Sequence, residues 1–222
     1  MQMTDESDNC LAQALSMLDQ WNLIDKADEI QPLGNAAVYK TSVLVYLMLY
    51  QRMSGNRSLK EAVEYFFNNA PITPNSNRRV RERSLDLESG SYSAASKRLS
   101  VDLVNWLQTQ VCDSIIRTTT PSFKSRRVFL IDGTILSAAP TPSLKKAFPP
   151  STNQRGVKVL PMIQLVTAHE LSSGAALPPE IGPQNGPNAI GETLLAEGLI
   201  ARLPPESTVM ADSAFGIFHV AF

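Results

Sequence analysis

The chain has 222 residues and a mass of 24.3 kDa, enough for one large domain or two small ones. It is 43% hydrophobic and 18% charged, which is typical of globular rather than disordered proteins. Its longest apolar run, 43–50, is far shorter than the about 20 residues of a membrane-spanning helix. The acidic N-terminus is unlike a signal peptide, and Cys10 and Cys112 are too few for a disulfide scaffold, so we expect a cytoplasmic protein without a membrane partner.

The net charge of −1 hides an uneven distribution. Residues 78–127 hold 10 basic and 5 acidic side chains, whereas the segments on either side are both net negative. A basic segment of this kind suits either a solvated helix face or contact with a polyanion such as DNA.

The first half is predicted to be helical. Leucines recur at helical spacing near the N-terminus, at Leu11, Leu15 and Leu18. The apolar run 43–50 predicts a helix buried on all sides. Ser58 and Glu61 form a capping box that predicts a helix from residue 59 to residue 67. A further helix is predicted over 93–116.

The second half is predicted to mix strands and helices. An apolar run at 127–131 predicts a buried strand that ends in a turn at Asp132 and Gly133. The expected order continues with a strand over 156–169, its hairpin partner at 174–181, a helix over 189–203 and a strand over 207–211. The predicted fold class is therefore α+β, with a helical region over 1–120 and a mixed α/β region over 121–222.

Two aspartates each follow one of these short hydrophobic strands. Asp132 follows Phe-Leu-Ile, and Asp212 follows Val-Met-Ala. If the two strands are neighbours in one sheet, both carboxylates lie at the same edge. Carboxylate oxygens suit Mg²⁺ or Mn²⁺, and a metal pair about 3.5–4 Å apart supports phosphodiester chemistry. Each aspartate considered by itself is as typical of a turn after a strand as of a metal ligand.

One competing enzyme class is excluded by a single position. Asp-Gly-Thr after a strand also ends the D-x-D-G-T motif of haloacid-dehalogenase-type phosphatases. Their nucleophilic aspartate would stand two residues before Asp132, where this chain has Leu130. A leucine cannot form the phosphoenzyme, so this route is lost.

Four motifs occur in a fixed order along the chain: FLIDGT at 129–134, NQRG at 153–156, AHELSSG at 168–174 and VMADSAFG at 209–216. Together they resemble the bacterial DDE transposases of the insertion-sequence-four-like group. The segment YSAASKRL at 92–99 is similar to the part of that family ahead of its catalytic domain. The resemblance spans about residues 40–222, and the ordered set is more specific than any one motif.

The resemblance implies a ribonuclease-H-like fold with its first two catalytic acids at Asp132 and Asp212. It implies Mg²⁺ or Mn²⁺ ions that activate water and then the freed 3′ hydroxyl, so that transposon ends are cut and joined. The implied partners are double-stranded DNA at the transposon ends and a second copy of the chain in a synaptic complex. The implied location is the bacterial cytoplasm, in association with the nucleoid.

The family also needs a third acid, a glutamate in a Y-x2-R-x3-E-x6-K helix well downstream of the second aspartate. This sequence ends ten residues past Asp212. Four glutamates of the second half, at positions 170, 180, 192 and 197, precede that aspartate and are not convincing substitutes. We therefore expect a truncated catalytic domain that does not catalyse strand transfer alone.

Two groups of basic residues are candidate DNA contacts, because cations that neutralise phosphates give salt-sensitive binding. The first group lies in the basic middle segment and consists of Arg78, Arg79, Arg81, Arg83, Lys97 and Arg98. The second lies between the first two predicted strands and consists of Lys145, Lys146, Arg155 and Lys158. Solvated surface positions are the alternative for both groups.

Three functions stay open at this level. The first is a transposase fragment that cuts and joins transposon ends with a divalent metal. The second is a catalytically inactive remnant that binds the ends or inhibits the full-length enzyme. The third is a general ribonuclease-H-like nuclease, which would cut duplexes without end specificity.

Overall fold

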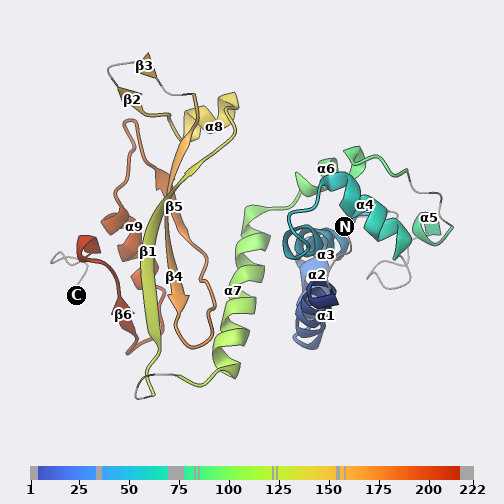
Figure 1. Ribbon diagram of the computed structural model, residues 1–222, viewed down its shortest axis with the longest axis horizontal. Coiled ribbons are helices and arrows are strands. Elements are labelled where there is room, and N and C mark those ends of the chain that lie inside the picture. The colour runs from blue at the N-terminus through green and yellow to red at the C-terminus, as the bar shows by residue number, and fades with distance from the viewer. Residues whose placement is uncertain are drawn as a thin grey trace. The chain divides into compact units, whose positions relative to one another are not determined.

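The computed structural model describes residues 5–33, 37–69, 78–82, 84, 86–121, 123, 125–153, 156–157 and 159–215. Its fold class is α+β, as predicted, and it divides into two compact units, Met1–Gln110 and Val111–Phe222 (Figure 1). The sequence-based boundary at residue 120 falls ten residues later than this division. None of the helices in the described ranges is long and apolar enough to cross a membrane.

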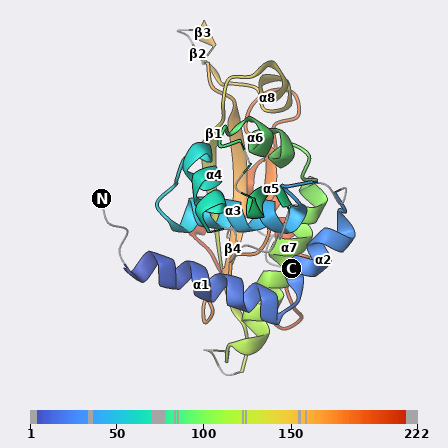
Figure 2. The same ribbon diagram turned by 90° about the vertical axis from the view of Figure 1, so that its right-hand side faces the viewer.

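The first unit is built from helices (Figure 2). In chain order they are α1 (Asp5–Gln20), α2 (Leu23–Ile30), α3 (Thr41–Met53), α4 (Leu59–Asn68), α5 (Arg78–Arg81), α6 (Gly90–Ser96) and the first part of α7 (Val101–Thr118). Every residue of α3 from Thr41 to Leu47 is buried, which confirms the prediction of a central helix. Buried residues around the whole circumference mean that α3 is packed on all sides.

The predicted helix over 93–116 is two helices, α6 and α7. The break falls at Ser100, whose hydroxyl accepts a hydrogen bond from the backbone N–H of Leu103 at 3.1 Å. Its own backbone N–H donates to Oε1 of Gln31 at 3.1 Å. A serine that caps the first turn starts a new helix, and this local signal outweighs the continuous leucine spacing.

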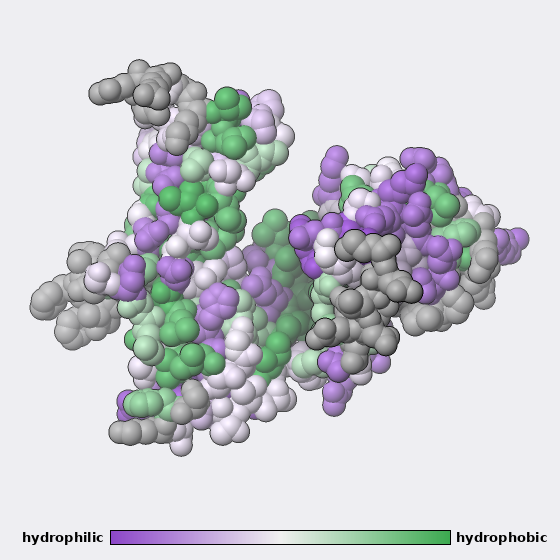
Figure 3. All heavy atoms as spheres, in the orientation of Figure 1, coloured by the Kyte–Doolittle hydropathy of each residue, from purple (hydrophilic) through white to green (hydrophobic). Residues whose placement is uncertain are grey.

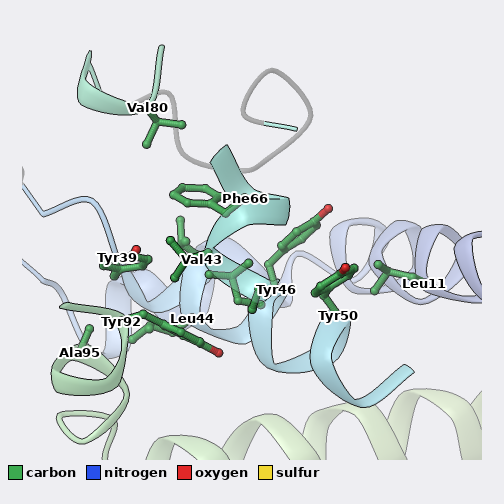
Figure 4. Packing of buried hydrophobic residues seen from close by; sticks show 13 residues of the cluster. Leu11, Tyr39, Val43, Leu44, Tyr46, Tyr50, Phe66, Val80, Tyr92 and Ala95 are labelled. Atoms are coloured by element: carbon green, nitrogen blue, oxygen red, sulfur yellow. The ribbon is translucent and has the colours of Figure 1, made fainter. Parts of the chain in front are cut away.

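Aromatic rings fill the core of the first unit (Figure 4). The ring of Tyr39 lies 5.6 Å from that of Tyr92 and 6.0 Å from that of Phe66. Tyr50 and Tyr65 stack with their ring centres 3.8 Å apart. Burial raises the pKa of Tyr39 and of Tyr92 to about 12, so both hydroxyls stay protonated at neutral pH.

The predicted capping box at the start of α4 is confirmed. The backbone N–H of Glu61 donates to the Ser58 hydroxyl at 3.2 Å, and the backbone N–H of Ser58 donates to the Glu61 carboxylate at 2.8 Å. Two donors that the helix itself cannot satisfy are therefore paired.

The second unit contains a four-stranded sheet in the order β5-β4-β1-β6. β1 is antiparallel to β4 and parallel to β6, and β4 is antiparallel to β5. Its elements are β1 (Val128–Ser137), α8 (Pro142–Ala147), β2 (Thr152–Asn153), β3 (Gly156–Val157), β4 (Met162–Glu170), β5 (Glu180–Pro183), α9 (Glu192–Ile200), β6 (Thr208–Met210) and the 3-10 turn η2 (Ser213–Phe215). The predicted strand over 156–169 is thus two strands, because Pro161 has no N–H to donate to a ladder.

The prediction that the first strand ends in a turn at Asp132 is wrong. β1 continues for five more residues, and Asp132 pairs with Thr167 in the middle of the ladder with β4. The long antiparallel partner supplies hydrogen bonds on both sides of Gly133, which overrides the local preference of Asp-Gly for a turn.

A second hydrophobic core forms where α9 packs on the sheet. Phe129 and Ile131 of β1 meet Leu195 and Leu199 of α9 in this core, and all four are buried. Figure 3 shows hydrophobic areas that remain on the visible surface of this unit. The face of β1 that carries Phe129 and Ile131 is therefore the buried face of this strand.

Candidate functional site

Asp132 lies within β1, and Asp212 stands two residues after the end of β6, the parallel neighbour of β1. Along β1 and β6 each residue lies opposite one numbered 80 higher, beginning with Val128 and Thr208. The two aspartates have this same separation of 80, and the ladder itself ends two residues before them, at Leu130 and Met210. Neighbouring strands lie about 4.8 Å apart, which lets two carboxylates reach one small cation.

Asp132 points away from α9. A Cβ atom on Gly133 would lie 2.6 Å from the carboxyl carbon of Glu192, so Gly133 faces α9. Because successive residues of a strand alternate between faces, the Asp132 side chain lies on the opposite face together with Leu130. Asp132 and Asp212 are both exposed. The pair is therefore open to a large ligand.

The local backbone fixes each aspartate in a different way. Oδ1 of Asp132 accepts a hydrogen bond from the backbone N–H of Gly133 at 2.9 Å. The backbone carbonyl of Asp212 accepts from the N–H of Phe215 at 3.2 Å, which closes the turn η2. Phe215 is buried in the second core, so that turn anchors the chain directly after β6.

Three of the glutamates considered as a third acid are occupied elsewhere. Glu180 forms an ion pair with Arg202 at 2.9 Å. Glu192 accepts a hydrogen bond from the Gln164 amide at 2.8 Å, on the α9 face of the sheet. Glu170 has no exposed surface and accepts from the backbone N–H of Ser173 at 2.7 Å. Each is therefore held by a structural contact.

Two aspartates provide only part of the ligand set of a divalent cation. Two carboxylates with water in the remaining positions match the preference of Mg²⁺ and Mn²⁺ for oxygen ligands. Within the part of the chain that the structure describes, no group of three or more acidic, histidine or cysteine side chains could hold a metal ion. The pair by itself thus supplies protein ligands for one cation rather than for two.

The basic residues of the first unit lie on α5 and beyond α6. Arg78 is exposed and forms an ion pair with Glu82 at 2.7 Å, and Arg79 is also exposed. Lys97 and Arg98 directly follow α6 and are exposed. Of this predicted group, Arg83 and the side chain of Arg81 lie outside the described residues.

The basic residues of the second unit lie on α8. Lys146 is exposed and Lys145 is half-buried in the last turn of that helix. α8 follows the Ser137 end of β1, whereas Asp132 lies five residues earlier in the strand (Figure 1). Arg155 and Lys158 lie outside the described residues.

Sequence reasoning missed a buried ion pair next to this sheet. Arg127 Nη1 lies 3.6 Å from the Glu170 carboxylate, and its guanidinium also donates to the backbone carbonyls of Ile116 and Thr119. Burial raises the pKa of Glu170, but hydrogen bonds from Ser173 and Ser172 lower it more, so the pKa lies below its ordinary value. The sequence signal was an arginine directly before an apolar strand.

Among known proteins, no family model, curated protein or solved structure matches this chain.

Proposed function

We propose that the protein acts in DNA transposition and that Asp132 and Asp212 hold a divalent cation at the phosphodiester that reacts. The observation that carries the proposal is the parallel register of β1 and β6, whose paired residues are 80 apart, the same separation as that of the two aspartates. Both aspartates are exposed, and Asp132 lies on the sheet face away from α9, which supports a substrate as large as a DNA duplex. Mg²⁺ or Mn²⁺ bound there would polarise a phosphate oxygen and activate the attacking oxygen.

The sheet topology supports a ribonuclease-H-like fold for the second unit. Within the four-stranded sheet, β1 comes first in the chain and β6 comes fourth. The aspartates thus stand on the first strand and after the fourth, the two positions that the resemblance to DDE transposases implies. Antiparallel pairing of β1 with β4 and of β4 with β5, followed by a parallel β6, agrees with the same fold.

The role of the carboxylates is tested by titrating the purified chain with Mn²⁺ in a calorimeter. We expect one weak site, and we expect Asp132→Asn and Asp212→Asn each to lower the affinity at least about tenfold, because each removes one of two charged ligands. Asp113→Asn is the matched control, since this exposed aspartate lies on α7 in the same unit and removes the same charge. Equal affinities of all four proteins would contradict the proposal.

The role in transposition is tested with a plasmid that carries the coding sequence and its natural flanking DNA. We expect salt-sensitive binding to duplexes from these flanks and Mn²⁺-dependent nicking at their ends that is lost in Asp132→Asn. Binding without cleavage would instead support an inactive DNA-binding remnant. Cleavage of unrelated duplexes at an equal rate would support a general nuclease.

A further inference from the structure

The first unit contains a cavity of about 380 Å³ far along the chain from the aspartate pair. It lies where the end of α3, the turn before α4 and the helix α6 meet. Its lining holds two arginines and no acidic side chain; the residues are Met48, Gln51, Arg52, Asn56, Arg57, Leu59, Tyr92 and Ser96. A volume of this size lies at the lower end of the range of small-molecule sites.

Hydrogen bonds fix the floor of the cavity. The Tyr92 hydroxyl donates to Oε1 of Gln51 at 2.6 Å, and the Gln51 amide donates to the backbone carbonyl of Arg57 at 2.8 Å. Tyr92 is 1% exposed, so this chain of contacts starts in the aromatic core. The arginine backbone is therefore held in place before any ligand binds, which lowers the entropic cost of binding.

The two arginines keep donors that the described residues do not use. Arg52 makes one hydrogen bond, from Nη1 to Asn56 at 3.0 Å. Arg57 pairs with Glu61 through Nη1 at 2.9 Å, while its buried Nε has no hydrogen-bond partner in the described part of the chain. A guanidinium carries five N–H donors, so both arginines keep further donors for an acceptor in the cavity.

We infer that this cavity binds a nucleotide, with its phosphate on Arg52 and Arg57. Guanidinium groups present paired donors that match phosphate oxygens. Two apolar residues, Met48 and Leu59, also line the cavity; each is 39% exposed, and they offer contact to a sugar and base. The nucleotide is either free or part of a DNA strand. Binding in this cavity is independent of the function proposed for Asp132 and Asp212.

The test measures binding of thymidine monophosphate, unphosphorylated thymidine and a short DNA duplex by calorimetry. We expect Arg52→Gln and Arg57→Gln each to weaken binding of the phosphate-bearing probe by about tenfold, because each removes charged hydrogen bonds. Lys60→Gln is the matched control: it removes the same charge close to Arg57 but does not line the cavity, and we expect less than about a twofold change.

A second variant separates binding from folding. Leu59→Glu places a carboxylate in the cavity lining at the first residue of α4, where the helix dipole favours a negative charge. We expect a normal circular dichroism spectrum and no phosphate binding. If the monophosphate binds and the duplex does not displace it, the ligand of the cavity is a free nucleotide. If only the duplex binds, the ligand is a nucleotide within DNA.

Three results would overturn the inference. The first is that neither phosphate-bearing probe binds. The second is that thymidine and its monophosphate bind equally well. The third is that Lys60→Gln lowers the affinity for the monophosphate as much as Arg57→Gln does.

Discussion

Glu170 is a carboxylate with no exposed surface, and its environment shows how the sheet accommodates a buried charge. Its Oε2 accepts from the Ser173 backbone at 2.7 Å, and Arg127 lies 3.6 Å from its Oε1. Removing a buried charge from water is costly unless it is paired and hydrogen-bonded. Glu170 is paired with Arg127 and hydrogen-bonded through Oε2, while Oε1 has no hydrogen-bond partner among the described residues. These contacts tie the end of β4 to the start of β1.

We predict that Glu170→Gln lowers the free energy of unfolding by about 1–3 kcal/mol, because it leaves Arg127 without its buried counter-charge. The difference in the free energy of unfolding between this variant and wild type should be complete above pH 4.5, the ordinary pKa of the Glu170 carboxyl group. It should shrink as the pH falls below that value. The folded pKa is lowered, so protonation at acid pH removes the stabilisation in wild type as well.

Urea denaturation at several pH values measures this effect. Glu180→Gln is the control, because its ion pair with Arg202 is partly exposed and should contribute less than about 1 kcal/mol. A difference for Glu170→Gln that does not shrink on acidification would contradict the prediction.

At the level of elements, serine side chains cap the first turns of α4 and α7. Ser58 caps α4 through its side chain, whereas Ser89 stands at the same position of α6 without a side-chain hydrogen bond. Ser100 caps α7 and separates it from α6. The three serines have the same chemistry, and their surroundings determine which of them stabilises a helix.

We predict that Ser58→Ala lowers the free energy of unfolding by about 1 kcal/mol, because a backbone N–H at the start of α4 loses its acceptor. Ser89→Ala removes the same hydroxyl but no cap, and it should change stability by less than about 0.5 kcal/mol. Thermal unfolding followed by circular dichroism distinguishes the two. Equal destabilisation would show that the capping box does not contribute as described.

Two glycines allow α9 to approach the sheet closely. A Cβ on Gly133 would meet the Glu192 carboxyl group at 2.6 Å, and a Cβ on Gly182 would overlap the Ile190 side chain. The carboxyl group is the end of a flexible side chain and can move, whereas Ile190 is β-branched and packs against the second core. Gly182 is therefore the position at which a larger residue is least tolerated.

At the scale of the whole molecule, each unit has its own hydrophobic core and only one contains strong fluorophores. Both tryptophans, Trp21 and Trp106, and all five tyrosines fall within Met1–Gln110. Intrinsic fluorescence therefore reports on the first unit, whereas circular dichroism reports on both.

We predict that Gly182→Ala destabilises the second unit by about 1–3 kcal/mol, because the added methyl group forces Ile190 aside. The circular dichroism transition should shift to lower denaturant, and the fluorescence transition should stay in place. Gly191→Ala is the control, since the nearest atom to its added Cβ would be 4.0 Å away. A shift of both signals by the same amount would show that the two cores unfold as one cooperative unit.

The sequence by itself missed α8 and the hairpin of β2 and β3. It determined the α+β class, the buried helix α3, the capping box at Ser58 and the order of α9 and the strands of the main sheet. These features depend on local periodicity and on side-chain contacts within one helical turn. The sequence also identified Asp132 and Asp212 as a candidate pair from the strands before them.

Only the tertiary structure decided where those aspartates lie. Local preference predicted a turn at Asp132, but pairing with β4 keeps the residue inside a strand. The parallel register with β6, the burial of Glu170 against Arg127 and the cavity beside Arg57 all join segments distant in sequence. Such contacts form because the chain must bury apolar surface and satisfy its backbone hydrogen bonds together, and a local sequence pattern contains neither constraint.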